Sequence, residues 1–261
     1  MREFIFIIPR TPKSYKTKIR QSLWKITQQS LIKQTYSSWK ALVVCDDFDE
    51  KPADERFIYI RSEALKKGEK INDAINYITS NKIDVDFVIR LDDDDVMMPD
   101  SLKKSLSYDF DVYADKHHAF YDLSSGLSSI VKRKWLANTV IHNASHALKI
   151  SEDTGLHIIN HDHSLKWHRY YKDKKIVYAK MNSPIYIRIL SPVSVSAIGS
   201  NNYINYLSFF GKWKFNIPTS FNDYLIQLKK IQKENKLLIK PTKYSWFYNI
   251  KSKVFKKILS I

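Results

Sequence analysis

One stretch of this chain, residues 85–99, limits the possible folds more than any other, because an apolar run ends there in four consecutive carboxylates. Residues 87–91 predict a short buried strand, and the four aspartates at 92–95 follow it directly. Neighbouring carboxylates raise one another's pKa values unless a cation or hydrogen-bond donors offset their charge. Because side chains alternate along a strand, we expect Asp92 and Asp94 to share one side and chelate a cation, and Asp93 to point away and tolerate substitution.

A solvated acidic turn or a helix cap would also explain the four aspartates, with Asp95 or Asp100 acting only as a cap. A calcium-binding loop of the EF-hand type is excluded, because its sixth position requires glycine and its twelfth requires glutamate, and this segment supplies neither. Ligands of open α/β sheets bind outside the carboxyl ends of the strands. A parallel sheet would therefore place these acids where a ligand binds.

The remaining apolar pattern of the first half predicts such a sheet. Amphipathic helices are predicted around residues 19–31 and 71–78, from apolar residues at three- and four-residue spacing. The order of elements predicts an α/β fold with a largely parallel central sheet flanked by helices. The predicted buried strands are residues 4–8, 39–45, 57–60 and 87–91. Four later runs predict a mixed extension of the same sheet: residues 110–113, 118–121, 127–131 and 184–190.

Residues 201–261 are expected to form a helical extension rich in basic and aromatic side chains. Ser220 and Asp223 resemble a capping box at the start of an amphipathic helix that continues to Leu238. From residue 236 onward the chain has seven lysines and no acidic residue. This tail is expected either to bind an anionic membrane surface or to pack on the domain as a last helix.

The excess of basic residues restricts the kinds of partner. Lys and Arg number 43 against 27 Asp and Glu, a formal net charge of +16, which indicates an anionic partner such as a nucleotide, a nucleic acid, a phosphorylated glycan or an anionic lipid. The single cysteine, Cys45, excludes an internal disulfide. No apolar run approaches the roughly 20 residues of a membrane span. We therefore expect a cytoplasmic protein, with at most peripheral contact at the inner face of the plasma membrane.

Three segments of the first half resemble GT-A-fold glycosyltransferases of family 2. They are the strand that ends at Pro9, the run Gln-Thr-Tyr-Ser-Ser-Trp before a strand that ends in Asp46 and Asp47, and the Leu-Asp-Asp-Asp-Asp run that leads to Pro99. In that family a Leu-Asp-x-Asp-Asp segment followed by proline forms the D-x-D motif. More narrowly, the aspartate run and the later His-Asp-His-Ser at residues 161–164 are similar to a bacterial group of rhamnosyltransferases.

The resemblance implies one domain with a nucleotide-sugar donor half, residues 1–105, and an acceptor half, residues 106–200. It places Asp92 near the ribose of the donor and Asp94 on a Mn²⁺ or Mg²⁺ ion that bridges the diphosphate. Hard oxygen ligands suit those ions, which bind through one or two carboxylates together with substrate phosphates.

The same resemblance places Pro9 at the donor site and Asp46 or Asp47 near the base or ribose. The chain departs from the family here, because the Asp-Asp-Gly-Ser type of turn is replaced by Asp-Asp-Phe-Asp. Arg10 and Lys70 are candidates for phosphate contact, and the alternative is that both are simply solvated.

Candidate residues of the acceptor half lie between positions 152 and 163. His161 or His163 could supply a third metal ligand, and Asp162 could accept the proton of the acceptor hydroxyl. Histidines in a loop after an apolar run are also common as hydrogen-bonded structural residues. Glu152 and Asp153 are a loose analogue of the acidic pair that marks the base in family 2.

These expectations describe a metal-dependent glycosyltransferase that moves a sugar from a nucleoside diphosphate-sugar to a glycan or lipid-linked acceptor in bacterial surface polysaccharide synthesis, with inversion implied by the resemblance. One alternative is a nucleotidyltransferase, although the glycine-rich phosphate loop of that class is absent from residues 9–12, Pro-Arg-Thr-Pro. The other is a basic nucleic-acid-binding module, although no recognised motif is present. Without a metal, an acidic cluster at a strand end would repel phosphate, so we expect no nucleic acid partner.

Overall fold

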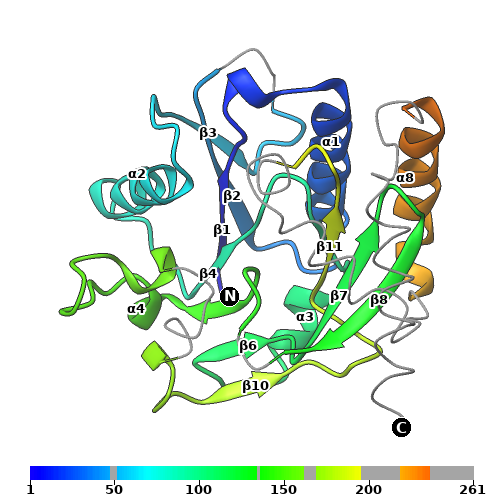
Figure 1. Ribbon diagram of the computed structural model, residues 1–261. Helices are drawn as coiled ribbons and strands as arrows, with labels where there is room; N and C mark the ends of the chain where they lie inside the picture. The colour runs from blue at the N-terminus through cyan, green and yellow to red at the C-terminus, as the bar shows by residue number, and fades with distance from the viewer. Residues whose placement is uncertain (48–51, 134–135, 162–168, 195–217, 236–261) are drawn as a thin grey trace, which may run out of the picture.

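The computed structural model describes residues 1–47, 52–133, 136–161, 169–194 and 218–235 (Figure 1). These residues form a seven-stranded sheet, in the order β10-β6-β9-β4-β1-β2-β3, and a four-stranded sheet, in the order β5-β11-β7-β8. The predicted α/β fold with a largely parallel central sheet is confirmed.

Four parallel strands make up the first half of the seven-stranded sheet. β1 lies between β2 and β4, and β3 pairs with the outer side of β2. Every residue of β1 is buried, as is every residue of β2 except Lys40, which is why both strands appear in the sequence as continuous apolar runs. The four strands are β1 (Phe4–Pro9), β2 (Trp39–Cys45), β3 (Phe57–Arg61) and β4 (Phe87–Arg90).

Two amphipathic helices cover opposite faces of these strands. α1 (Lys18–Ile32) packs Trp24 against the face that includes Phe6, and α2 (Lys67–Ser80) packs Ile75 against the face that includes Ile7. Because neighbouring residues of β1 point to opposite faces, the strand supplies both cores at once.

The second half of the chain extends this sheet with three short strands. β6 (Val112–Ala114) and β10 (Ile176–Tyr178) run parallel to each other, and β9 (Ile141–Asn143) lies between β6 and β4 and is antiparallel to both. β9 and β10 were not predicted, because strands of three residues show little pattern in the sequence; the equally short β6 was predicted at residues 110–113.

The other predicted strands form a separate sheet, so the expectation of one extended sheet is wrong. β11 (Tyr186–Leu190) pairs with β7 (His117–Asp122) and with the two-residue β5 (Val96–Met97), and β8 (Leu127–Lys132) pairs with β7. The inward-facing side chains of this sheet, such as Tyr121, build an apolar core of their own. That separate core is the physical reason for the division.

Helix α1 is shared between the two sheets. Its Trp24 and Leu31 belong to the core of the seven-stranded sheet, whereas its Ile19, Leu23 and Ile26 pack with the four-stranded sheet. Figure 1 shows α8 next to α1, and the Lys33–Asp223 ion pair joins the two helices, which share one apolar core with the four-stranded sheet.

Helix α8 (Asn222–Glu234) confirms the predicted amphipathic helix but not its start. The capping-box prediction is wrong, because a 3-10 turn, η3 (Thr219–Phe221), precedes the helix and no side chain caps it. Asp223 instead pairs with Lys33 of α1 at 2.8 Å. The helix ends before Leu238, and the basic tail lies outside the described residues.

The remaining helical segments of the described chain are short. None of the described helices combines the length and the apolar character needed to cross a membrane. The short segments are η1 (Lys13–Tyr15), α3 (Ser101–Ser105), α4 (Ala144–Ala147) and η2 (Ile158–Asn160).

A buried carboxyl joins the end of β6 to the start of β11. Asp115 is 2% exposed, and its two oxygens accept the backbone N–H of Ile185 at 3.1 and 3.0 Å. Burial raises the pKa of Asp115 to about 8, against the backbone N–H groups of Ile185 and Tyr186, which favour the charged form. The native state therefore holds a proton that the unfolded chain releases at lower pH.

This shift predicts that part of the folding stability is lost as the pH rises. The contribution of Asp115 is complete below its ordinary pKa of 3.8 and is lost as the pH rises to about 8, with a slope of at most about 1.4 kcal/mol per pH unit. Asp115→Asn keeps an acceptor oxygen and cannot ionise, so its stability should fall less between pH 5 and pH 8. Urea unfolding of both proteins at several pH values checks this, and equal slopes would contradict it.

Candidate active site

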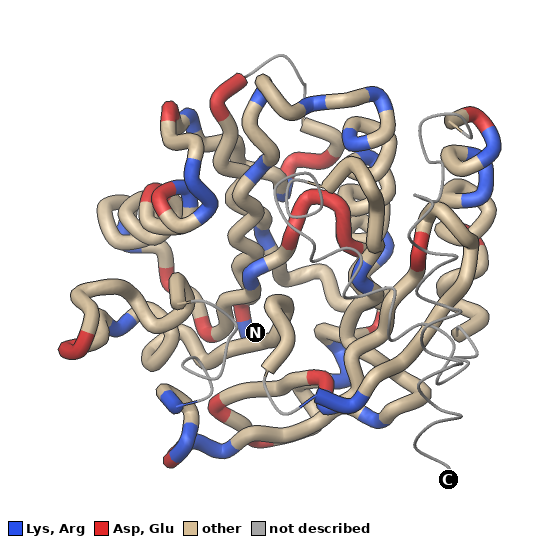
Figure 2. Tube along the Cα trace, in the orientation of Figure 1, with Lys and Arg blue, Asp and Glu red and all other residues tan. Residues whose placement is uncertain are grey.

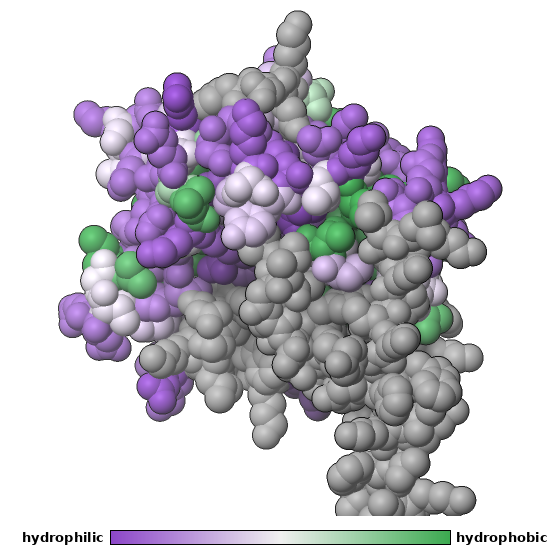
Figure 3. All heavy atoms as spheres, turned by 45° about the horizontal axis from the view of Figure 1, so that its top comes forward, coloured by the Kyte–Doolittle hydropathy of each residue, from purple (hydrophilic) through white to green (hydrophobic). Residues whose placement is uncertain are grey.

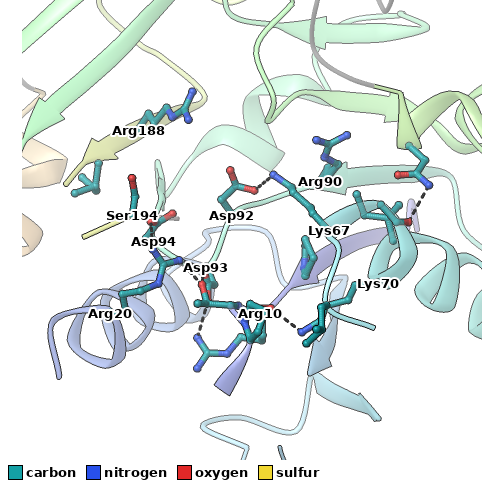
Figure 4. A pocket seen from close by; sticks show the side chains of 18 of the residues that line it. Arg10, Arg20, Lys67, Lys70, Arg90, Asp92, Asp93, Asp94, Arg188 and Ser194 are labelled. Carbon is teal, nitrogen blue, oxygen red and sulfur yellow. Dashed lines mark hydrogen bonds and ion pairs between the residues drawn. The ribbon is translucent and has the colours of Figure 1, made fainter. Parts of the chain in front are cut away.

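A cavity of about 500 Å³ lies at the carboxyl ends of β1 and β4 and reaches to β11 (Figure 4). The face of the molecule at this end is mainly hydrophilic, with only small separate apolar areas (Figure 3). In the tube view the acidic run after β4 crosses the middle of the molecule with basic segments close by (Figure 2). Most side chains of its lining come from four places: the β1–α1 loop, the first turns of α1 and α2, the end of β4, and β11.

Asp93 accepts hydrogen bonds from two arginines and from Thr11. Its Oδ1 accepts hydrogen bonds from the Thr11 hydroxyl (3.0 Å) and from Arg20 Nη2 (3.0 Å). Its Oδ2 accepts from the Thr11 backbone N–H (2.8 Å) and from Arg10 Nη1 (3.2 Å). All three of these charged residues are at least 94% buried.

The prediction that Asp93 points away from the site and tolerates substitution is therefore wrong on its first part, and the geometry argues against the second. The strand ends at Arg90, and Asp93 and Asp94 form a turn in which the backbone N–H of Asp95 bonds to the Asp92 carbonyl at 3.3 Å. Alternation along a strand no longer applies in a turn.

Asp92 and Asp94 line the cavity, and each contacts a basic side chain. Asp92 Oδ1 forms an ion pair with the ammonium of Lys67, and Asp94 Oδ2 lies 3.3 Å from Arg20 Nη1. Burial works against the charged form of Asp92, but Lys67 outweighs it and lowers the pKa of that carboxyl. Burial raises the pKa of Asp94 to about 6, where repulsion by Asp93 and Asp92 adds to the shift and Arg20 opposes it.

Asp95 faces the second sheet rather than the cavity. Its Oδ1 accepts the backbone N–H of Ile189 in β11 at 3.0 Å, and its backbone carbonyl accepts the hydroxyl of Thr27 in α1 at 2.8 Å. Burial raises the pKa of Asp95 well above its ordinary value, and Asp94 and Asp92 add to that rise. The residue therefore fixes the acidic turn between α1 and β11.

Basic side chains outnumber acidic ones along the cavity, with six against three in its lining. Four of the six are buried, and the two that remain partly exposed are Lys67 and Arg188. Arg90 illustrates the buried kind, because its Nη1 donates to the carbonyls of Ile159 (3.1 Å) and His161 (3.0 Å). The cavity therefore combines a metal-type pair of carboxylates with a surplus of positive charge for an anionic ligand.

The residues predicted around the end of β2 are held by lysines. Asp47 binds Lys16 Nζ with both oxygens at 2.6 Å, and Asp46 accepts the backbone N–H of Lys13 at 2.9 Å. Partial burial opposes the charge of Asp46, but that N–H and Lys70 outweigh it, and the pKa of Asp46 is lowered. Neither aspartate is among the residues that line the cavity.

Pro9, Arg10 and Lys70 line the cavity, but the two basic residues are buried. Arg10 stacks on Trp24, with its guanidinium carbon 4.2 Å from the ring centroid. Lys70 Nζ donates to the Arg10 carbonyl at 2.9 Å and lies 3.5 Å from Asp46. In this arrangement both support the floor of the cavity.

The acceptor-side candidates that the structure describes, Glu152, Asp153 and His161, do not line the cavity that holds the carboxylate pair. His161 Nε2 lies 3.0 Å from the Thr154 hydroxyl, and the ring stacks on Tyr170 at a centroid distance of 4.3 Å. Asp153 is exposed and does not line the cavity. Asp162 and His163 lie outside the described residues, so their predicted roles stay predictions.

Asp92 and Asp94 fit a Mn²⁺ or Mg²⁺ ion that also binds substrate phosphates. Such ions need only one or two protein carboxylates, and no cluster of three metal-ligating side chains occurs in the described part of the chain. The repulsion that raises the pKa of Asp94 is the condition that a bound cation relieves. The donor set therefore suits a hard divalent cation held jointly by protein and ligand.

Sequence reasoning missed three basic residues of the site, although each carries a signal. Lys67 begins α2, where the helix dipole disfavours a cation. Arg20 lies on the buried face of α1 among apolar residues. Arg188 interrupts the apolar strand β11. A charge placed where local structure disfavours it indicates a compensating partner.

We predict that Asp93→Ala destabilises the fold strongly. The change leaves the buried guanidinium groups of Arg10 and Arg20 without their shared carboxylate, and loss of one partner from a buried ion pair costs about 3–5 kcal/mol. Urea unfolding at neutral pH measures the loss. Asp100→Ala serves as the matched control, because it removes an exposed ion pair with Lys104 and should cost no more than about 1 kcal/mol. Equal losses in the two variants would contradict the prediction.

Comparisons with known proteins give structural likenesses only. No family model matches the sequence, and no curated protein sequence matches it. S. aureus TarS, residues 1–349, aligns at a TM-score of 0.48 with 13% identity, over 89% of this chain and 72% of that one. A longer S. aureus TarS structure aligns at 0.42 with 12% identity, and this chain spans 53% of its length while 95% of this chain is covered. A protein described as a nucleotide-diphospho-sugar transferase from Desulfovibrio desulfuricans G20 aligns at 0.39 with 11% identity, over 92% of this chain and 97% of that one.

Proposed function

We propose that this chain is a metal-dependent glycosyltransferase that takes its sugar from a nucleoside diphosphate-sugar. The observation that carries the proposal is the cavity at the carboxyl end of β4, where Asp92 and Asp94 share one space with six basic side chains. A nucleoside diphosphate presents both a metal-binding diphosphate and a strong negative charge. Its diphosphate therefore suits a metal held by the two carboxylates, and its negative charge suits the basic side chains of the lining.

Within the proposed reaction, the residues of the chain bind and orient the donor. Asp92 and Asp94 would hold Mn²⁺ or Mg²⁺, and a bound ion of this kind supplies Lewis-acid stabilisation to a leaving diphosphate. Arg188, partly exposed on the wall opposite α2, would contact the phosphates in this proposal. Arg10, Arg20 and Lys70 keep the floor rigid, because each is buried and already bonded within the protein.

The acceptor side of the proposal rests on the resemblance described above. We propose a glycan or lipid-linked acceptor of bacterial surface polysaccharide synthesis and an inverting outcome, with the proton of the acceptor hydroxyl taken by Asp162. Asp153 is the weaker candidate, because its exposed turn does not line the cavity. Peripheral membrane contact through the C-terminal tail belongs to the same proposal.

The experiment that tests the function is a thermal-shift panel of UDP, GDP, dTDP and CMP, each with and without Mn²⁺. A ligand that binds only the native state stabilises it by mass action and so raises the melting temperature. At a ligand concentration of 100 times the Kd, the free energy of unfolding increases by about 2.7 kcal/mol. We expect at least one diphosphate to act, and to act more strongly with Mn²⁺. A panel without any response would overturn the proposal.

We predict that Asp94→Asn abolishes the Mn²⁺-dependent part of this stabilisation and lowers the rate of donor hydrolysis and transfer by at least about 100-fold, the scale at which loss of one electrostatic contact to a leaving group acts. The substitution removes a metal-ligating charge and keeps the size of the side chain. Asp84→Asn, an exposed change before β4, is the control and should behave as the unmodified protein. Unchanged turnover in the Asp94 variant would refute the metal role.

A further inference from the structure

Lys67 is a partly exposed cation that pairs with one carboxylate of the acidic site. Its ammonium reaches Asp92 from the first turn of α2, across the mouth of the cavity (Figure 4). The Lys67 side chain is 39% exposed, whereas the Arg20 side chain that pairs with Asp94 is 7% exposed. A ligand that enters from solvent therefore meets the Lys67–Asp92 pair before the buried pairs beneath it.

Lys67 and a divalent cation would compete for the same carboxylate. Lys67 occupies Oδ1 of Asp92, and Asp92 is one of the two carboxylates available to a metal. An ion shared by Asp92 and Asp94 would lie within a few ångströms of the ammonium, and like charges repel strongly in a partly buried site. Binding of one cation to Asp92 therefore weakens the binding of the other.

A diphosphate changes this competition. Lysine carries its charge on a flexible four-carbon stem, so the ammonium can leave Asp92 without a movement of the α2 backbone. Lys67 and Gly68 both line the cavity, which keeps a released ammonium beside any phosphate bound there. Metal binding would free the lysine, and the phosphate would give it a new partner.

We propose that Lys67 is a resident counter-cation of Asp92, which a divalent metal displaces and which then binds the phosphates of the nucleotide. The inference rests on the proposed function and adds a coupling to it. Because the freed ammonium favours phosphate and the bound phosphate keeps it away from Asp92, metal and nucleotide each strengthen the binding of the other.

The first test measures Mn²⁺ binding to the full chain without nucleotide, from the electron paramagnetic resonance signal of the free ion. Lys67→Met removes the competitor, so it should bind Mn²⁺ at least about fivefold more tightly, the lower end of ordinary coupling between two sites. Lys67→Arg keeps the charge and should bind as the unmodified protein does. Lys66→Met is the matched control, because Lys66 is 83% exposed and pairs with Glu69 instead.

The second test measures the affinity for UDP, GDP and dTDP with and without Mn²⁺. The factor by which Mn²⁺ tightens nucleotide binding should fall at least about fivefold in Lys67→Met and be restored in Lys67→Arg. A merely structural role of Lys67 would weaken both affinities and leave this factor unchanged. Melting temperatures of all variants, measured in parallel, separate any loss of folding from a change in binding.

The outcomes distinguish the inference from the function beneath it. Mn²⁺ binding that is present in the unmodified protein and equal or weaker in Lys67→Met would overturn the inference and leave the glycosyltransferase proposal standing. An absence of Mn²⁺ binding to both proteins, with every nucleotide, would overturn both. Loss of binding in Asp94→Asn, together with tighter binding in Lys67→Met, would support both.

Discussion

The buried carboxylate of Asp93 holds together the parts on which the site depends. It joins the loop after β1, through Arg10 and Thr11, to helix α1, through Arg20. Two buried guanidinium groups would be costly in isolation, and they are tolerated because one carboxylate pairs with both of them and also accepts the Thr11 N–H. Arg20 then reaches Asp94, so the position of the outer aspartate follows from the inner one.

The charges of the site lie in two layers with different tasks. In the inner layer, Asp93, Asp46 and Asp47 are paired with basic side chains that are 10% exposed or less. These pairs fix the geometry of the floor. In the outer layer, Asp92, Lys67 and Arg188 remain partly exposed. A ligand that binds therefore replaces ion-pair partners in the outer layer, while the desolvated ion pairs of the inner layer stay in place.

Much of the donor half could be predicted because of how it is buried. Strands β1, β2 and β4 are covered on both faces, so they appear as unbroken apolar runs that end where the acids begin. The second sheet could not be predicted, since the sequence does not show which strands pair across long separations. Strands β5, β9 and β10, with two or three residues each, carry no detectable period.

Prediction of the site residues from the sequence was limited for a similar reason. The carboxylates at positions 92 and 94 were predictable from their place after a strand, but the role of Asp93 depended on a turn that only the folded chain defines. Its partners Arg10 and Arg20 come from segments far away in the sequence. A pattern within one segment cannot reveal such partners, whereas a charge in an unfavourable place can indicate that a partner exists.

The double packing of α1 affects how the molecule can be recombined. Residues of this one helix complete the apolar cores of both sheets, and α8 from the far end of the described chain rests against it through the Lys33–Asp223 and Gln29–Gln227 contacts. A chimera cut near residue 105 would therefore inherit a helix shaped for the sheet it had lost. Exchange of the acceptor half between such proteins requires the outer face of α1 to be transplanted with it, as part of the same unit.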